Sequence, residues 1–230
     1  MASIRFRKHP SYYPNTALRF LKWPIAVLAV LSLPIYITEL ISSPLWNLSF
    51  HTLHRPLLGF VVYAMIWRLI LSRRFMGTYF STFEHELTHA VFAWLTCHRV
   101  VGLRVTWNRG GECAFEGSGG GNWLIAIGPY WFPTLLFPMI IAESFTHTAL
   151  LQYGVGIALG YHLLSTWREI HPQQTDLQKT GFIFAWAFLP SANIAVYHSA
   201  LAYTFFGAQV GLEVGARPVI RTCSKLLSLF

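Results

Sequence analysis

Apolar residues occur along this chain in long runs. Five of these runs cover about residues 23–42, 56–72, 123–142, 149–166 and 182–206. A helix that crosses a bilayer needs roughly 20 predominantly apolar residues, so each run is long enough, or nearly long enough, to span a membrane. A sixth apolar segment, about 77–97, also carries a cluster of histidine and glutamate residues. The pattern predicts a membrane all-α protein, a bundle of about six transmembrane helices.

Prolines lie inside several of these runs and would break helices in a soluble protein. They are Pro24, Pro34, Pro133, Pro138 and Pro190. Neighbouring helices in a membrane bundle can satisfy the backbone groups that a proline frees. We therefore expect the runs to remain helical.

One segment, about 99–116, does not have the pattern of a helix. Two short alternating runs flank Asn108, Arg109, Gly110 and Gly111, which is typical of a β-hairpin. The segment directly follows the sixth apolar run, so we expect a small hairpin insertion that rests against the membrane helices. No room remains for a separate soluble domain, and residues 1–230 are predicted to form a single multi-pass membrane domain.

Composition supports a lipid environment. Hydrophobic residues make up 54% of the chain and charged residues only 11%, which does not suit the surface of a soluble protein. The net charge of +8 comes from basic residues at the two ends and in short loops rather than on one face. We therefore expect contact with anionic lipid headgroups of the bilayer and no nucleic-acid partner. The three cysteines are widely spaced and indicate neither a disulfide framework nor a thiolate zinc site.

The sixth run contains the sequence His85-Glu86-Leu87-Thr88-His89. Residues four apart lie about 40° from each other around a helix, so both imidazoles can point at one metal ion. Histidine and glutamate are costly inside an apolar helix and usually mark a functional site there. A zinc ion (Zn²⁺) held by His85 and His89 is the prediction that follows.

Glu86 is displaced by about 100° around the helix from His85. In that position it is too far round to be an ideal ligand beside both histidines, but it can hold a water at the open position of the metal. Glu86 is therefore the candidate catalytic residue, a general base that takes a proton from the water and later passes one to the leaving amine.

A catalytic zinc site needs a third protein ligand. Asp176, the only aspartate in the chain, precedes the last apolar run and is the first candidate. Glu169, His171 and His162 are the alternatives. Asp176 could instead be a helix cap, and His162 a hydrogen-bonded residue inside the bundle.

Four further polar residues have less specific interpretations. Glu84 faces a different side of the helix from the motif and could orient a ligand from outside the first coordination sphere. Asn122, Asn193 and His198 could stabilise an oxyanion or bind the substrate backbone, but each could equally be an interhelical hydrogen-bond partner.

The residues resemble those of the site-2 protease family of intramembrane zinc metalloproteases. The resemblance rests on FEHELTHAVFAWLTCHRV within an apolar helix, the hairpin with its Gly110-Gly111 turn, the Gly128-Pro129 step and the late aspartate. It covers roughly residues 77–180. Two features differ from the usual family pattern: Thr88 replaces a glycine, and Asp176 lies in Thr175-Asp176-Leu177 rather than in Asn-Pro-Asp-Gly.

The resemblance implies that His85, His89 and Asp176 hold zinc and that Glu86 is the base. It also implies cleavage of a membrane protein or membrane-anchored peptide within or next to a transmembrane segment. The expected location is the cell membrane, in particular the bacterial inner membrane.

Three other classes of function compete with a protease. A catalytically inactive family-like protein would act by binding a partner membrane protein. A membrane di-iron hydroxylase would need about eight clustered histidines, and only one such cluster exists here. A transporter pathway lined by Glu39, Arg68, His162 and His198 would be expected to show matching half-repeats, and none is apparent.

Overall fold

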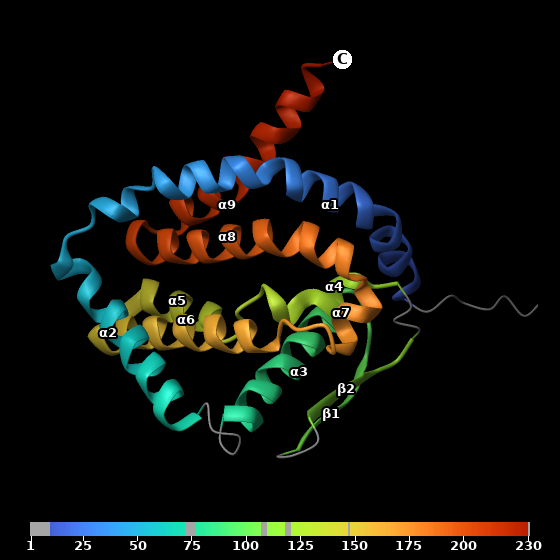
Figure 1. The fold of residues 1–230 in the computed structure, drawn as a ribbon, viewed down its shortest axis with the longest axis horizontal. Helices are drawn as coiled ribbons and strands as arrows, with labels where there is room; N and C mark the ends of the chain where they lie inside the picture. The colour runs from blue at the N-terminus through green and yellow to red at the C-terminus, as the bar shows by residue number, and fades with distance from the viewer. Residues whose placement is uncertain (1–9, 72–76, 107–109, 118–120, 147, 230) are drawn as a thin grey trace, which may run out of the picture.

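The computed structural model describes residues 10–71, 77–106, 110–117, 121–146 and 148–229. Within these residues the chain is mostly helical, and its two strands form one antiparallel hairpin. Figure 1 shows α2, α5 and α6 at one end of the molecule and the hairpin with α4 and α7 at the other. The hairpin predicted for 99–116 is confirmed by its two strands, while Asn108 and Arg109 of the predicted turn lie outside the described residues.

Three of the apolar runs, 77–97, 149–166 and 182–206, match observed helices closely, whereas the first helix begins 11 residues before its run and the helix over 208–227 was not predicted. The longer helices are α1 (Tyr12–Ile41), α2 (Phe50–Ile66), α3 (Gly77–Leu95), α5 (Leu136–Thr146), α6 (Ala149–Glu169), α8 (Phe182–Phe206) and α9 (Ala208–Leu227). The short elements are η1 (Pro44–Asn47), η2 (Trp67–Leu71), α4 (Trp123–Ile127), η3 (Gly128–Tyr130) and α7 (Thr175–Thr180). The strands are β1 (Val100–Thr106) and β2 (Gly110–Phe115).

Two helical segments among the described residues are long and apolar enough to cross a membrane: Tyr12–Asn47 and Phe50–Leu71. Both expose large apolar side chains on the outside of the protein, for example Phe20 and Val27 of α1 and Met65 of α2. Lipid is the solvent that suits such a surface. The predicted bundle of about six spans is not confirmed, since the remaining helices are shorter or carry polar residues such as Asn193 and His198 within α8.

The prediction of one unbroken helix over 123–142 is wrong. The chain forms α4, then the single turn η3, and it resumes a helix only at Leu136. Pro129 and Pro133 lack the backbone N–H that a continuous helix needs, and proline disfavours the helical conformation for the residue before it, as at Phe132, which lies outside any helix. Because of the break, the short helix α4 and the turn η3 contact α3, rather than one long helix.

Glycines allow α2 and α6 to pack with their backbones in contact. A Cβ atom on Gly156 of α6 would lie 1.9 Å from the carbonyl oxygen of Pro56, and one on Gly59 of α2 would lie 2.2 Å from that of Tyr153. Small residues at helix interfaces are typical of membrane proteins, where close van der Waals packing replaces the hydrophobic effect between helices.

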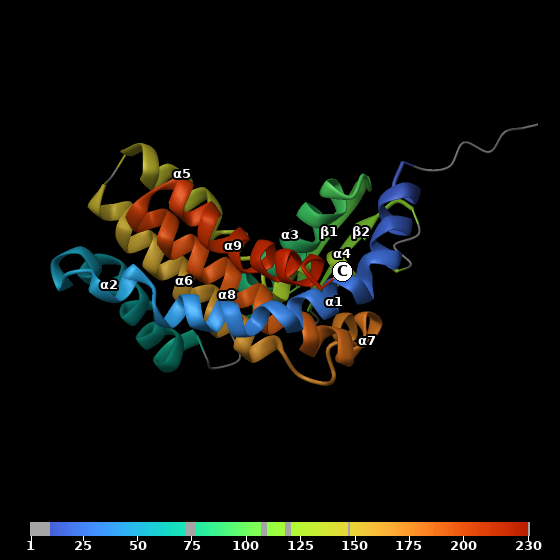
Figure 2. The same cartoon turned by 90° about the horizontal axis from the view of Figure 1, so that it is seen from above.

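A hydrophobic cluster lies at the end of the molecule that carries α4 and α7. It joins Ala26 of α1, Trp123 and Ile127 of α4, Leu177 of α7 and Phe184 of α8, all of them buried. The hairpin lies beside α3, as the two views in Figures 1 and 2 agree. The elements α3, α4, α7 and the hairpin therefore surround one region, and the predicted site residues lie there.

Candidate metal centre

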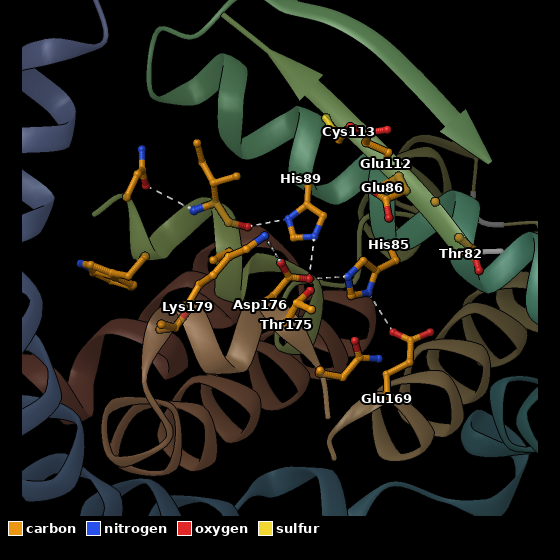
Figure 3. A pocket seen from close by; sticks show the side chains of 18 of the residues that line it. Thr82, His85, Glu86, His89, Glu112, Cys113, Glu169, Thr175, Asp176 and Lys179 are labelled. Atoms are coloured by element: carbon orange, nitrogen blue, oxygen red, sulfur yellow. Dashed lines mark hydrogen bonds and ion pairs between the residues drawn. The ribbon is translucent and has the colours of Figure 1, made fainter. Parts of the chain in front are cut away.

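The motif helix α3 presents His85 and His89 on one face. They are one turn apart, both side chains are buried, and the centroids of their rings are separated by 4.7 Å. Figure 3 shows both imidazoles pointing toward the carboxylate of Asp176. The geometry expected from the spacing of the motif is thus present in the structure.

Asp176 reaches the motif from α7, 91 residues after His85 along the chain. Its Oδ2 atom lies 3.4 Å from Nε2 of His85 and 3.4 Å from Nε2 of His89. The ligand atoms of the three residues all lie within 4.8 Å of one another. The structure therefore brings together the three residues that the sequence indicated as metal ligands.

The other ring nitrogen of each histidine is occupied by an acceptor. Nδ1 of His85 lies 2.9 Å from Oε2 of Glu169, and Nδ1 of His89 lies 2.7 Å from the carbonyl oxygen of Ile125. A carbonyl and a carboxylate only accept hydrogen bonds, so both Nδ1 atoms carry the proton and donate. In the neutral rings both Nε2 atoms then carry a lone pair directed at Asp176.

This donor set fits zinc. Zinc bonds of about 2.0 to 2.2 Å in tetrahedral geometry place neighbouring ligand atoms roughly 3.4 Å apart, which matches the two separations between Asp176 and the histidines. Three acceptor atoms that converge at such distances repel one another unless a cation lies among them. Donation from the second ring nitrogen to a carboxylate or carbonyl is also usual for metal-binding histidines.

The alternative third ligands do not face both Nε2 atoms of the motif histidines. Glu169 contacts His85 on the side of the ring away from Asp176, where it holds the imidazole in place. His171 lines the same cavity, but the described group of converging ligand atoms does not include it. His162 is buried inside the bundle and pairs with the hydroxyl of Tyr197. Of the four candidates, only Asp176 faces both Nε2 atoms.

Glu86 points away from the helix axis toward strand β2. The backbone N–H of Cys113 donates a hydrogen bond to its carboxylate. A Cβ atom on Gly111 would lie 2.4 Å from Cγ of Glu86, so only glycine allows the strand to approach this closely. Gly111, predicted as part of the hairpin turn, lies in β2 and allows this strand to approach the candidate base.

The four predicted site residues line an open cavity of about 990 Å³. Its walls come from α3, β2, the start of α4, Lys22 of α1 and the segment 168–180. Lys179 extends over the site, with its Nζ 3.6 Å from Oδ1 of Asp176. The cavity is polar enough to hold water beside the histidines, which hydrolysis requires.

Asp176 and Cys113, which lie outside the apolar helices and line the cavity, have shifted pKa values. Burial raises the pKa of the Asp176 carboxyl, but when His85 and His89 are protonated at Nε2, their hydrogen bonds and positive charge outweigh burial and hold that pKa well below its usual range. Asp176 is therefore ionised at neutral pH, as a metal ligand must be. Burial, together with the nearby charge of Glu86, raises the pKa of the Cys113 thiol to about 11.

The suggestion that Glu84 orients a metal ligand is wrong in this structure. Its carboxylate accepts hydrogen bonds from the backbone N–H groups of Thr134 and Leu135, so it fastens the loop before α5 to the motif helix. Glu169 has the role that the sequence left open for Glu84. Nothing in the local sequence marked Glu169 for this role, because the contact joins the end of α6 to α3.

The three residues with open interpretations prove to be hydrogen-bond partners between elements. Asn193 donates to the carbonyl oxygen of Tyr130, and His198 contacts the hydroxyl of Ser43 at 2.9 Å. Asn122 lines the cavity, but its amide oxygen accepts from the N–H of Ile125 and its nitrogen donates to Asn15. The carbonyl of Ile125, which holds His89, had no sequence signal of any kind.

Comparison with known proteins gives one match. The family model described as Peptidase M50B-like matches residues 57–223, more than half of the 230-residue chain. No curated protein and no solved structure matches the chain. The matched part contains His85, Glu86, His89 and Asp176, whereas α1 precedes it.

Proposed function

The chain belongs to the Peptidase M50B-like family, and from that premise we propose that it is an intramembrane zinc metalloprotease. It hydrolyses peptide bonds within or next to the transmembrane segments of membrane proteins. Membership of the family confirms the resemblance to site-2 proteases and supports a protease-related function.

One observation carries the proposal: Oδ2 of Asp176 lies 3.4 Å from Nε2 of both His85 and His89, and the ligand atoms of these three residues all lie within 4.8 Å of one another. A structural zinc site is normally closed by four protein ligands. Here three converge, and a polar cavity adjoins them. An open fourth position is what a hydrolytic zinc site needs.

His85, His89 and Asp176 would hold the metal, which when bound lowers the pKa of a coordinated water and polarises the scissile carbonyl. Glu86 accepts a proton from the attacking water as the new C–O bond forms. It then donates that proton to the amide nitrogen as the C–N bond breaks. The hydrogen bond from the Cys113 N–H keeps the Glu86 carboxylate in position for both transfers.

A multi-pass arrangement in the cell membrane is part of the proposal. It is supported by two helical segments that can span a bilayer and by the exposed apolar surface of α1 and α2. Inside a bilayer, a peptide bond in a helix is shielded by its own hydrogen bonds, so the substrate segment must unwind before it reaches Glu86. Substrates with helix-breaking residues near the cleaved bond are therefore expected.

Metal content tests the site itself. The full chain, purified in detergent, should contain about one zinc per molecule. His85→Ala, His89→Ala and Asp176→Ala should lose it, while Glu86→Gln should retain it because the base is not a ligand. Absence of zinc from well-folded wild type would contradict the proposal.

Cleavage separates the protease from the catalytically inactive, partner-binding alternative. The wild type and Glu86→Gln are reconstituted in vesicles with a reporter whose single transmembrane segment contains glycine and proline. Cleavage by the wild type and its loss in Glu86→Gln is the expected result. Full zinc occupancy without cleavage of any such reporter would favour the partner-binding protein.

A further inference from the structure

Helix α1 lies outside the matched residues, but side chains of its N-terminal half reach the elements that carry the metal site. We propose that Asn15 and Lys22 of α1 are positioning residues that hold the ligands His89 and Asp176 in place. This inference rests on the proposed zinc site. It assigns a role in metal binding to a helix that precedes the family match.

The first connection runs from His89 to α1 through α4. Nδ1–H of His89 donates to the carbonyl of Ile125, and the N–H of Ile125 donates to Oδ1 of Asn122, the residue that caps α4. Nδ2 of Asn122 donates in turn to Oδ1 of Asn15 at 2.8 Å. The orientation of His89 is thus linked through the short helix α4 to the side-chain amide of Asn15 in α1.

Asn15 also ties this connection back to the end of the motif helix. Its Nδ2 atom lies 3.2 Å from Nε2 of His98, whose Nδ1 contacts the hydroxyl of Thr96 at 3.0 Å. That hydroxyl donates to the carbonyl of Phe92. Because Asn15, Asn122, His98 and Thr96 are all buried, a broken link leaves a polar group without water to replace its partner.

The second connection runs from Asp176 to α1. Nζ of Lys22 donates to the carbonyl oxygen of Thr180, the last residue of α7, at 2.7 Å. The carbonyls at the end of a helix carry partial negative charge, which favours a cation there. The ammonium group also lies 5.2 Å from the ring centroid of Phe184, which covers it on one side.

Helix α7 depends on such support because it has only six residues. A helix this short is not stable alone. Leu177 anchors it in the cluster that contains Ala26 of α1 and Trp123 of α4, and Nε1 of Trp123 donates to the carbonyl of Leu18. Through α4 and α7, α1 therefore contacts the elements that position two of the three ligands, and Lys22 itself lines the cavity.

The test measures zinc affinity of the full-length protein in detergent by competition with a chromophoric chelator. Asn15→Leu and Lys22→Met should each weaken zinc binding about tenfold or more, the size usual for residues that orient a ligand. The visible absorption of the cobalt-substituted protein should change in both variants, because the ligands are displaced. Lys22→Arg, which can still donate to Thr180, should restore most of the affinity.

Matched controls separate positioning from general destabilisation. Thr16→Val alters the neighbouring residue of α1, whose hydroxyl bonds only locally to the carbonyl of Tyr12. Lys225→Met removes an exposed lysine of α9. Both should keep wild-type affinity and spectrum. If Asn15→Leu does not fold, Asn15→Ala replaces it: the acceptor for Asn122 and the donor to His98 are both lost, so weaker binding is still expected.

Wild-type zinc affinity and an unchanged cobalt spectrum in the folded Asn15 and Lys22 variants would overturn the inference and leave the proposed function intact. Equal losses in the two controls would also overturn it. Absence of metal binding by the wild type would instead remove the zinc site on which both proposals stand.

Discussion

Close contact between Glu86 and Gly111 shows how one residue of the hairpin constrains the candidate base. The sequence indicated Gly111 only as a turn residue. In the structure a side chain at this position would overlap both Glu86 and Thr82, with separations of 2.4 and 2.7 Å from a Cβ atom. Placement of a catalytic group within a fraction of an ångström matters, since a displacement of about 1 Å can cost on the order of 100-fold in rate.

Gly111→Ala should therefore reduce reporter cleavage by about 100-fold while zinc content stays at the wild-type level. Gly102→Ala is the matched control on the other strand, where a Cβ atom meets only Ala114 at 3.9 Å. Cleavage and metal content are measured side by side for the two variants. Wild-type cleavage by Gly111→Ala would show that the contact with Glu86 does not position the base.

Glu169 offers a second test at the residue scale. Its carboxylate accepts the Nδ1–H of His85 and so fixes which ring nitrogen faces the metal. Glu169→Ala should weaken zinc affinity by about 10- to 100-fold without abolishing binding. Glu116→Ala, which removes an exposed carboxylate of the hairpin, should have no effect on affinity. Complete loss of zinc from Glu169→Ala, as from Asp176→Ala, would indicate that Glu169 is itself a ligand.

Two helices of this fold meet through glycine rather than through large side chains. Gly156 of α6 allows its backbone to touch the carbonyl of Pro56 in α2, and Gly160 of the same face contacts Phe60. The run 149–166 was predicted as a span from its apolar residues. The partner of that span could not be predicted, because glycines at intervals of four residues do not specify which helix they face.

Gly156→Ala should destabilise the protein by roughly 2 kcal/mol, since the added methyl group forces the two backbones apart. Gly154→Ala lies on the same helix, where a Cβ atom meets only Met139 at 3.6 Å. There the higher helix propensity of alanine should leave stability unchanged or raise it by about 0.5 to 1 kcal/mol. Thermal unfolding in detergent compares the two. Equal unfolding temperatures would contradict the close packing of α2 and α6.

The break between α4 and α5 is the main departure from the expected elements. Prolines were expected to be tolerated within a span, and this holds for Pro24 and Pro34, which lie inside α1. It fails where Gly128, Pro129 and Pro133 follow one another closely. Pro129, four residues after Ile125, has no backbone N–H to donate to the carbonyl of Ile125. That carbonyl can therefore accept the hydrogen bond from His89.

At the scale of the whole molecule, the fold and the metal site are stabilised by different contacts. The hydrophobic clusters that join α1, α4, α7 and α8, and those that join α5, α6 and α8, do not contain the three candidate metal ligands. The helices should therefore remain folded when the metal is removed. The convergent ligands would then lose the cation that offsets their mutual repulsion.

Removal of zinc with a chelator should abolish reporter cleavage and leave the helical circular dichroism unchanged. The unfolding temperature should fall, because a ligand that binds only the folded state stabilises it by mass action. Added zinc should restore both cleavage and the unfolding temperature. Loss of the helical signal on chelation would mean instead that the metal is required for the fold.

The sequence by itself determined the features that depend on neighbours along the chain. The spacing of His85 and His89 places both on one face of any helix, and the alternating runs around Gly110 and Gly111 predict a local hairpin. The first candidate for the third ligand also came from the sequence, because Asp176 is its single aspartate.

Tertiary structure alone decided which distant groups meet this helix. Asp176, Glu169 and the carbonyl of Ile125 reach the histidines from three separate elements, and the support from α1 comes from a fourth. Such contacts depend on how helices pack and where prolines interrupt them. Packing depends on how the surfaces of several elements fit together, and the sequence of one segment does not specify this.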